Sequence, residues 1–232
     1  MNAVTPNTGL NERLNKLRAA VLGANDGIVS TAAVVVGVAG ATSDARAIAA
    51  SGLASLVGGA VSMALGEYVS VSSQRDMERA YIAKERQLHQ DDPNGEFDHL
   101  VRGYMRDGLS RPTALRVARE MTATNPLRAH LKMHYGIDQD DIVSPWTAAA
   151  ASFLSFFVGA LVPLAAVLSP PAQWRVPLTF VVTLAALALT GHVSARIGGA
   201  SPGRAVLRLV LGGAIGLAVT FGAGWVFGAT VG

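Results

Sequence analysis

Residues 21–30, VLGANDGIVS, decide the fold, because they place one carboxylate, Asp26, inside the first long apolar segment of the chain. A charge near the interior of a bilayer is costly unless it is paired, hydrated or bound to a cation, so an acid at this depth indicates an ion or proton site. The second apolar segment carries another acid, Glu67. Two acids in consecutive apolar segments indicate cation movement through a membrane.

The composition is typical of a membrane protein. Half of the 232 residues are hydrophobic, 15% are charged and 25 are glycine, as expected where helices pack closely in lipid. The chain contains no cysteine, which excludes disulfides, thiolate metal sites and cysteine nucleophiles. Oxygen, imidazole and thioether groups remain as metal ligands, so any bound metal is expected to be hard or borderline.

Five segments are long enough to cross a hydrocarbon core of about 30 Å, which requires roughly 20 helical residues. They cover residues 17–40, 47–72, 146–168, 174–196 and 205–229. Residues 1–16 precede them, and a polar insert occupies residues 73–145 between the second and third spans. We therefore predict an all-α membrane protein, with two spans in 17–72, three spans in 146–232 and a small helical domain inserted between them.

Turn signals divide the insert into short helices. A loosely amphipathic run begins at Met77 and is broken by residues 92–95, DPNG. A second helix is expected at 96–106, and a third after Pro112, because proline suits a first helical turn. A last short helix is expected from Pro126 to Gly136, and no strand is predicted anywhere.

Basic residues are concentrated on one side of the spans. Eleven lie in the insert, and the others on that side are Arg13, Lys16, Arg18, Arg196, Arg204 and Arg208. Only Arg46 and Arg175 lie on the opposite side. The positive-inside rule therefore predicts a cytoplasmic amino terminus and insert, with the carboxyl terminus outside. A cleaved signal peptide is the alternative for the first span, but Asp26 and the length of the segment argue against it.

Side chains within the first two spans suit a cation path. Met63 and Glu67 are four residues apart and share one helix face. We expect Asp26 and Glu67 to lie in the inner half of the membrane and to line one vestibule. Glycines that permit close contact or local unwinding surround these positions: Gly23, Gly27, Gly58, Gly59 and Gly66. The alternative is that both acids snorkel or cap near the interface and that Met63 only packs.

Two segments of these spans resemble the signature sequences of the vacuolar iron transporter family. They are residues 23–30, GANDGIVS, and residues 62–71, SMALGEYVSV, and a third span containing Pro163 fits the same pattern. The resemblance implies a homodimer that exports Fe²⁺, and often Mn²⁺ or other divalent cations, from the cytosol in exchange for protons. It also implies that Asp26, Met63 and Glu67 line the translocation path between the two subunits.

The insert departs from the family pattern, in which glutamates on its helices bind metal and methionines lie near the last of them. Glu85 and Glu96 match that pattern, whereas Gln87, His99 and His134 stand where glutamates are expected. His130 lies one turn before His134, and His99 follows Glu96 by three residues, so each pair can converge on one ion. Imidazole lowers the negative charge and favours borderline metals. The alternative is that the insert has lost its site and that these histidines are solvated.

These features predict a transporter of Fe²⁺ or Mn²⁺, with Zn²⁺ and Co²⁺ as further candidate ions, and no prosthetic group. Its expected partners are a second subunit, the lipid bilayer and protons, without nucleic acid, and its expected location is the plasma membrane if the source is bacterial. We do not expect an enzyme, because the spans show no nucleophile and base pair or phosphate loop. A non-transporting metal sensor or assembly protein is the alternative.

Overall fold

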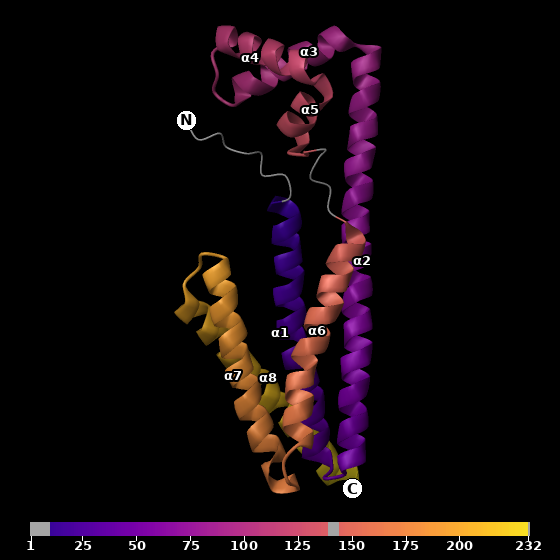
Figure 1. The fold of residues 1–232 in the computed structure, drawn as a ribbon, viewed down its shortest axis with the longest axis vertical. Coiled ribbons are helices and arrows are strands. Elements are labelled where there is room, and N and C mark those ends of the chain that lie inside the picture. The colour runs from indigo at the N-terminus through magenta and orange to yellow at the C-terminus, as the bar shows by residue number, and fades with distance from the viewer. Residues whose placement is uncertain (1–9, 139–143, 232) are drawn as a thin grey trace. The chain divides into compact units, whose positions relative to one another are not determined.

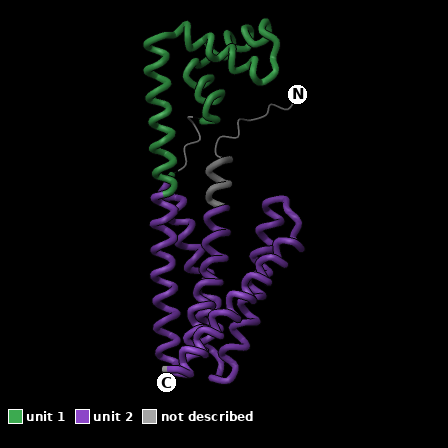
Figure 2. Tube along the Cα trace, turned by 180° about the vertical axis from the view of Figure 1, so that it is seen from behind, with its two compact units in different colours: residues 1–13, 70–144 green, residues 14–69, 145–232 purple. Residues whose placement is uncertain are grey.

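The computed structural model describes residues 10–138 and 144–231, which are almost entirely helical and include no strand. The predicted all-α fold is therefore confirmed over the described residues. The chain divides into two compact units, one of residues 1–13 and 70–144 and the other of residues 14–69 and 145–232 (Figure 2). Most of the predicted amino-terminal segment, 1–16, lies outside the described residues.

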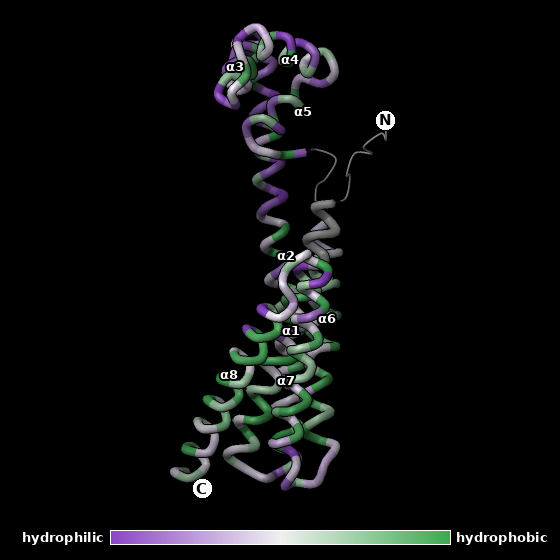
Figure 3. The backbone as a smooth tube through the Cα atoms, turned by 90° about the vertical axis from the view of Figure 1, so that its left-hand side faces the viewer, coloured by the Kyte–Doolittle hydropathy of each residue, from purple (hydrophilic) through white to green (hydrophobic). Residues whose placement is uncertain are grey.

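Five long helices account for the predicted membrane spans. They are α1 (Leu10–Ala41), α2 (Ala45–Asp91), α6 (Pro145–Leu168), α7 (Ala172–Ile197) and α8 (Pro202–Val231) (Figure 1). Each is long and apolar enough to cross a membrane. Hydrophobic residues predominate along them, apart from the polar part of α2, whereas the short helices between α2 and α6 are largely hydrophilic (Figure 3). As predicted, the described residues include five helices that are long and apolar enough to span a membrane.

Helix α2 continues well beyond its predicted apolar span. Its 47 residues run without a break from the second span through the run that begins at Met77. The reason is local, because residues 73–91 contain neither glycine nor proline. The helix ends where Pro93 begins the next one and the Asp92 carboxylate accepts a hydrogen bond from the Gly95 N–H at 2.9 Å.

Close backbone approach joins α1 to α6 in the second unit. A Cβ atom added to Gly27 would collide with the Phe156 carbonyl oxygen, and one added to Gly159 would collide with the Ala24 carbonyl oxygen. Phe156 of α6 also packs against α2 in a buried cluster completed by Leu56, Ala60, Ala160 and Leu164. Small residues therefore hold α1 against α6, which fixes the face that α1 turns away from the protein.

In its described residues, the first unit contains four short helical segments besides the polar part of α2. They are α3 (Pro93–Arg106), α4 (Arg111–Thr124), α5 (Pro126–His130) and the π-helical turn η1 (Leu131–Tyr135). Their core consists of Leu100, Val101, Ala114, Ala118 and Ala129. Gly108 and Gly136 have φ angles of 95° and 66°, a region that favours glycine, and they follow the helices that end there. The predicted helix boundaries in the insert are accurate to within a few residues.

Candidate metal sites

A cluster of carboxylates and imidazoles lies in the first unit. Its members come from four segments: Glu85 and His89 from α2, Glu96 and His99 from α3, His130 from α5 and His134 from η1. Glu85, His89 and Glu96 each offer a ligand atom within 4.8 Å of the other two. The Nδ1 atom of His130 lies 3.2 Å from Glu96 Oε2 and 3.7 Å from Glu85 Oε2. The fold therefore brings two acids and two imidazoles to one point.

Burial keeps the central imidazole neutral. The His130 side chain is 1% exposed, and burial, followed by the neighbouring His89, His134 and His99, lowers its pKa from 6.5 to about 4. The pKa of His134 is lowered as well, mainly by burial and then by His99. A neutral imidazole is the form that binds metal, so both rings are available as ligands at neutral pH.

Hydrogen bonds orient two of the cluster's side chains. His89 Nδ1 lies 2.9 Å from the Glu85 carbonyl oxygen, which only accepts, so a hydrogen bond at this contact requires the proton on Nδ1. The Tyr135 hydroxyl hydrogen-bonds to the Glu85 side chain, and burial together with this bond raises the pKa of Tyr135. The Tyr135 ring in turn stacks on Tyr81 with centroids 4.5 Å apart. These contacts fix the orientation of Glu85 before any ion binds.

The donor set of the cluster fits a divalent cation. Glu85 Oε2, Glu96 Oε2, His130 Nδ1 and His134 Nε2 are buried and have no hydrogen-bond partner among the described residues. Buried polar atoms without partners are costly, and a shared cation would satisfy several of them at once. Mixed carboxylate and imidazole ligands suit Fe²⁺, Co²⁺ and Zn²⁺ better than Mg²⁺ or Ca²⁺.

Sequence reasoning identified most of this cluster but missed one member. Glu85, Glu96, His99, His130 and His134 all lie in it; the His99 and His134 rings stack with centroids 4.4 Å apart. His89 was not predicted, although its position four residues after Glu85 places both on one face of α2. Gln87, the residue expected at a glutamate position, is exposed.

The second unit contains an ion pair between α1 and α2. Arg18 Nη2 lies 3.5 Å from Glu67 Oε1, and the two side chains are 63% and 13% exposed. Next to Glu67, the Tyr68 ring contacts Trp146 of α6 with centroids 4.7 Å apart. Aromatic and basic residues of this kind gather at membrane interfaces. Glu67 therefore lies near one end of the apolar segment of α2, beside the start of α1's span.

The three predicted path residues lie at successive depths. Helices α1 and α2 are antiparallel neighbours, because Arg18 is opposite Glu67 and the Thr31 hydroxyl lies 3.2 Å from the Ser55 hydroxyl. At a rise of 1.5 Å per residue, Met63 lies about 6 Å from the level of Glu67 along the axis of α2. Asp26 lies about 12 Å from the same level, in the same direction, along the axis of α1. Within one chain these residues form a series of positions rather than a single cage.

Asp26 faces out of the chain. It is exposed, as are Arg18 and Leu22, and the three residues follow one another at intervals of four along one face of α1. Met63, in contrast, is partly buried against the cluster that contains Phe156. An exposed carboxylate in the middle of an apolar helix requires water, an ion or another protein surface beside it.

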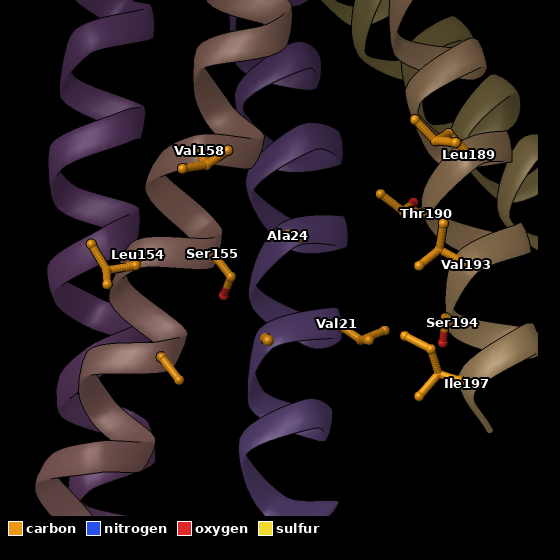
Figure 4. Close-up of a pocket in the computed structure, with 12 residues that line it drawn as sticks. Val21, Ala24, Leu154, Ser155, Val158, Leu189, Thr190, Val193, Ser194 and Ile197 are labelled. Atoms are coloured by element: carbon orange, nitrogen blue, oxygen red, sulfur yellow. The ribbon is translucent and has the colours of Figure 1, made fainter. Parts of the chain in front are cut away.

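A separate groove in the same unit is apolar. It has a volume of about 620 Å³ and is bounded by α1, α6 and α7; its described lining contains no ionisable side chain (Figure 4). Among the lining residues, Thr190 donates a 2.6 Å hydrogen bond to the Asn25 side chain, which links α7 to α1 next to Asp26. The described lining of the groove therefore offers no carboxylate or imidazole to a metal ion, whereas the exposed face of α1 offers the carboxylate of Asp26.

Five apolar helices, acids within them and a buried cluster of glutamates and histidines define a polytopic membrane protein with a candidate metal site. The sequence profile of the VIT family matches residues 17–225. A vacuolar iron transporter of Acanthamoeba castellanii is 40% identical over 210 residues, which cover 90% of this chain and 77% of that protein. Vacuolar iron transporter homolog 5 of Oryza sativa subsp. japonica is 38% identical over 222 residues, which cover 95% of this chain and 84% of that protein. The chain belongs to the VIT family, a family of membrane transporters.

The low pKa of His130 predicts how the first unit responds to acid. The unfolded chain binds a proton at about pH 6.5 and the folded chain only at about 4, so folding stability rises with pH between these values and is lost as pH falls through them. The full effect is on the order of 3 kcal/mol. In chelator-treated protein, hydrogen-exchange protection of α5 and η1, corrected for intrinsic rates, should fall between about pH 7 and about pH 5.

The matched control for this experiment is His192→Gln, which removes an exposed histidine of α7 and should leave the pH dependence unchanged. Protection that stays constant or rises on acidification would contradict the prediction. That result would mean that Glu85 and Glu96 stabilise the imidazolium more than burial penalises it.

Proposed function

We propose that this chain moves Fe²⁺ or Mn²⁺ out of the cytosol through the membrane in exchange for protons. Membership of the VIT family supports iron as a transported metal. The observation that carries the proposal is the series Glu67, Met63 and Asp26, which offers oxygen and sulfur ligands at three depths along α1 and α2. No enzymatic role is proposed.

The series suits a stepwise passage with proton exchange. A carboxylate binds either a metal ion or a proton with the same oxygen, so protonation from the far side releases the ion and restores the site. Met63 adds a soft thioether between the two acids, which favours Fe²⁺ over Mg²⁺ or Ca²⁺. In this account Glu67 meets the cation first on the cytoplasmic side and Asp26 receives it next.

The exposed position of Asp26 supports a homodimer. A second copy of the chain placed against the α1 face that carries Leu22 and Asp26 would remove the carboxylate from lipid and enclose a path between the subunits. The adjacent exposed face of α2 suits close packing. It is apolar and small-residue rich, with Leu53, Val57, Val61, Leu65 and Val69 in one row and Gly58 and Gly66 in the next.

The cluster in the first unit is proposed to collect the metal in the cytoplasm. Glu85, His89, Glu96 and His130 supply two oxygens and two nitrogens, a set that binds Zn²⁺ and Co²⁺ more strongly than Mn²⁺ in the usual affinity order. His99 and His134 lie beside them as a stacked pair. The cluster is therefore expected to be less suited to Mn²⁺ than an all-carboxylate site.

The transport role of Asp26 is tested by Asp26→Asn, which keeps the shape of the side chain and removes its charge. Metal flux into liposomes with an acidic lumen should fall at least about tenfold, because the cation loses a charged ligand worth 1.4 kcal/mol or more. Asp76→Asn, at an exposed site on the polar part of α2, is the control and should transport normally. Unchanged flux in the Asp26 variant would rule out this role.

The metal preference of the cluster is tested by the double variant His99→Glu, His134→Glu. Added carboxylates should raise the affinity for Mn²⁺ roughly tenfold, so the ratio of the Zn²⁺ affinity to the Mn²⁺ affinity should fall. Titration calorimetry on the whole protein measures both affinities. His192→Gln serves as the control. If neither metal's affinity changes, the cluster is not a binding site.

The dimer is tested by Leu22→Cys. Because the chain has no native cysteine, the new thiol reports only its own neighbours, and it should form a disulfide-linked dimer in membranes on mild oxidation. Leu154→Cys, exposed on α6 at the groove, is the control and should remain monomeric. Equal cross-linking at both positions, or at neither, would contradict the proposed interface.

A further inference from the structure

The ion pair of Arg18 and Glu67 joins two groups of very different environment. The Glu67 side chain is 13% exposed, whereas the Arg18 side chain is 63% exposed. Glu67 Oε1, the atom nearest the guanidinium, is buried and has no hydrogen-bond partner among the described residues. The 3.5 Å contact is thus an electrostatic attraction without an aligned hydrogen bond. The acid is largely shielded from solvent, and the arginine is held to it only by charge.

Such a pair can exchange its cation at little cost, although it cannot simply open. A buried carboxylate needs a compensating cation, because removing its partner leaves an uncompensated charge. An exposed guanidinium, in contrast, regains water as soon as it leaves. A metal ion that reaches Glu67 can therefore take the place of Arg18 while the arginine moves into solvent.

The position of Arg18 on α1 gives this exchange a direction. Arg18, Leu22 and Asp26 follow one another on one exposed face, and Asp26 is two helical turns, about 12 Å, beyond Arg18. A cation that approaches Asp26 along this face from the Arg18 end passes the guanidinium first. Arg18 therefore stands beside the first acid of the series and before the last one.

We propose that Arg18 is a positioning residue whose guanidinium pairs with the Glu67 carboxylate when no metal is bound. An entering divalent ion must then displace the guanidinium to bind Glu67. This inference rests on the proposed function. Between transport cycles the guanidinium of Arg18 compensates the negative charge of Glu67. A monovalent ion brings no more charge than the arginine it would replace, whereas a divalent ion brings twice as much, so the exchange favours divalent cations.

The experiment compares Arg18→Gln, Arg18→Lys and wild type in metal flux and in thermal unfolding of the full chain. Loss of the competing charge in Arg18→Gln should lower the KM for Mn²⁺ roughly fivefold, the size expected of a partly exposed pair. Arg18→Lys keeps the charge and should remain near the wild-type KM. Arg196→Gln, which removes another exposed arginine of the same unit, controls for a general change in surface potential.

Unfolding without metal tests the pair independently of transport. Arg18→Gln should lower the Tm of chelator-treated protein by about 2–4 °C, and it should have no further effect when Glu67→Gln is already present. Added Mn²⁺ should raise the Tm of Arg18→Gln at lower concentrations than it does for wild type.

Three results would overturn the inference: an unchanged KM and Tm in Arg18→Gln, an Arg18→Lys variant that behaves like Arg18→Gln, or an equal shift in Arg196→Gln. These differ from failure of the proposed function, which would appear as absence of metal flux in wild type. In that case the double-mutant cycle of Arg18→Gln and Glu67→Gln, measured by thermal unfolding, and the dependence of Tm on Mn²⁺ still decide whether Arg18 and metal compete for Glu67.

Discussion

The cost of placing a carboxylate in a membrane-spanning helix governs this structure. Glu67 meets that cost within the chain through Arg18, 3.5 Å away, whereas Asp26 is exposed on the face of α1 that looks out of the chain. The two acids therefore have different requirements. Glu67 needs a cation that can be exchanged, and Asp26 needs a surface or water that a second subunit would enclose. Both requirements suit a path for divalent cations.

The same helix, α2, carries ligands of two chemical kinds. In its apolar part it presents Met63 and Glu67, and in its polar part Glu85 and His89. The cluster in the first unit is rich in imidazole, and burial lowers the pKa of its central ring, His130, to about 4. The proposed path in the apolar part relies on carboxylates, whose oxygens bind either a metal ion or a proton. The proposed capture and the proposed passage therefore involve groups whose chemistry suits each task.

Local signals in the sequence predicted the spans and the breaks between the short helices, because glycine and proline act within a few residues, as at Pro93 and Gly136. The site was predicted less completely. His89 was missed because its approach to Glu96 and His130 depends on how α3 and α5 pack against α2, which no local pattern encodes. Arg18 was interpreted as a topology charge, since its pairing with Glu67 depends on the register of α1 against α2, which no local pattern encodes.

Uphill metal transport tests the central claim most directly. Wild-type protein is reconstituted into liposomes with an acidic lumen, and Fe²⁺ accumulation is followed before and after an ionophore collapses the proton gradient. The account predicts accumulation above the external concentration that stops, and reverses, when the gradient is lost. Accumulation that continues unchanged without the gradient, or no accumulation at all, would contradict it.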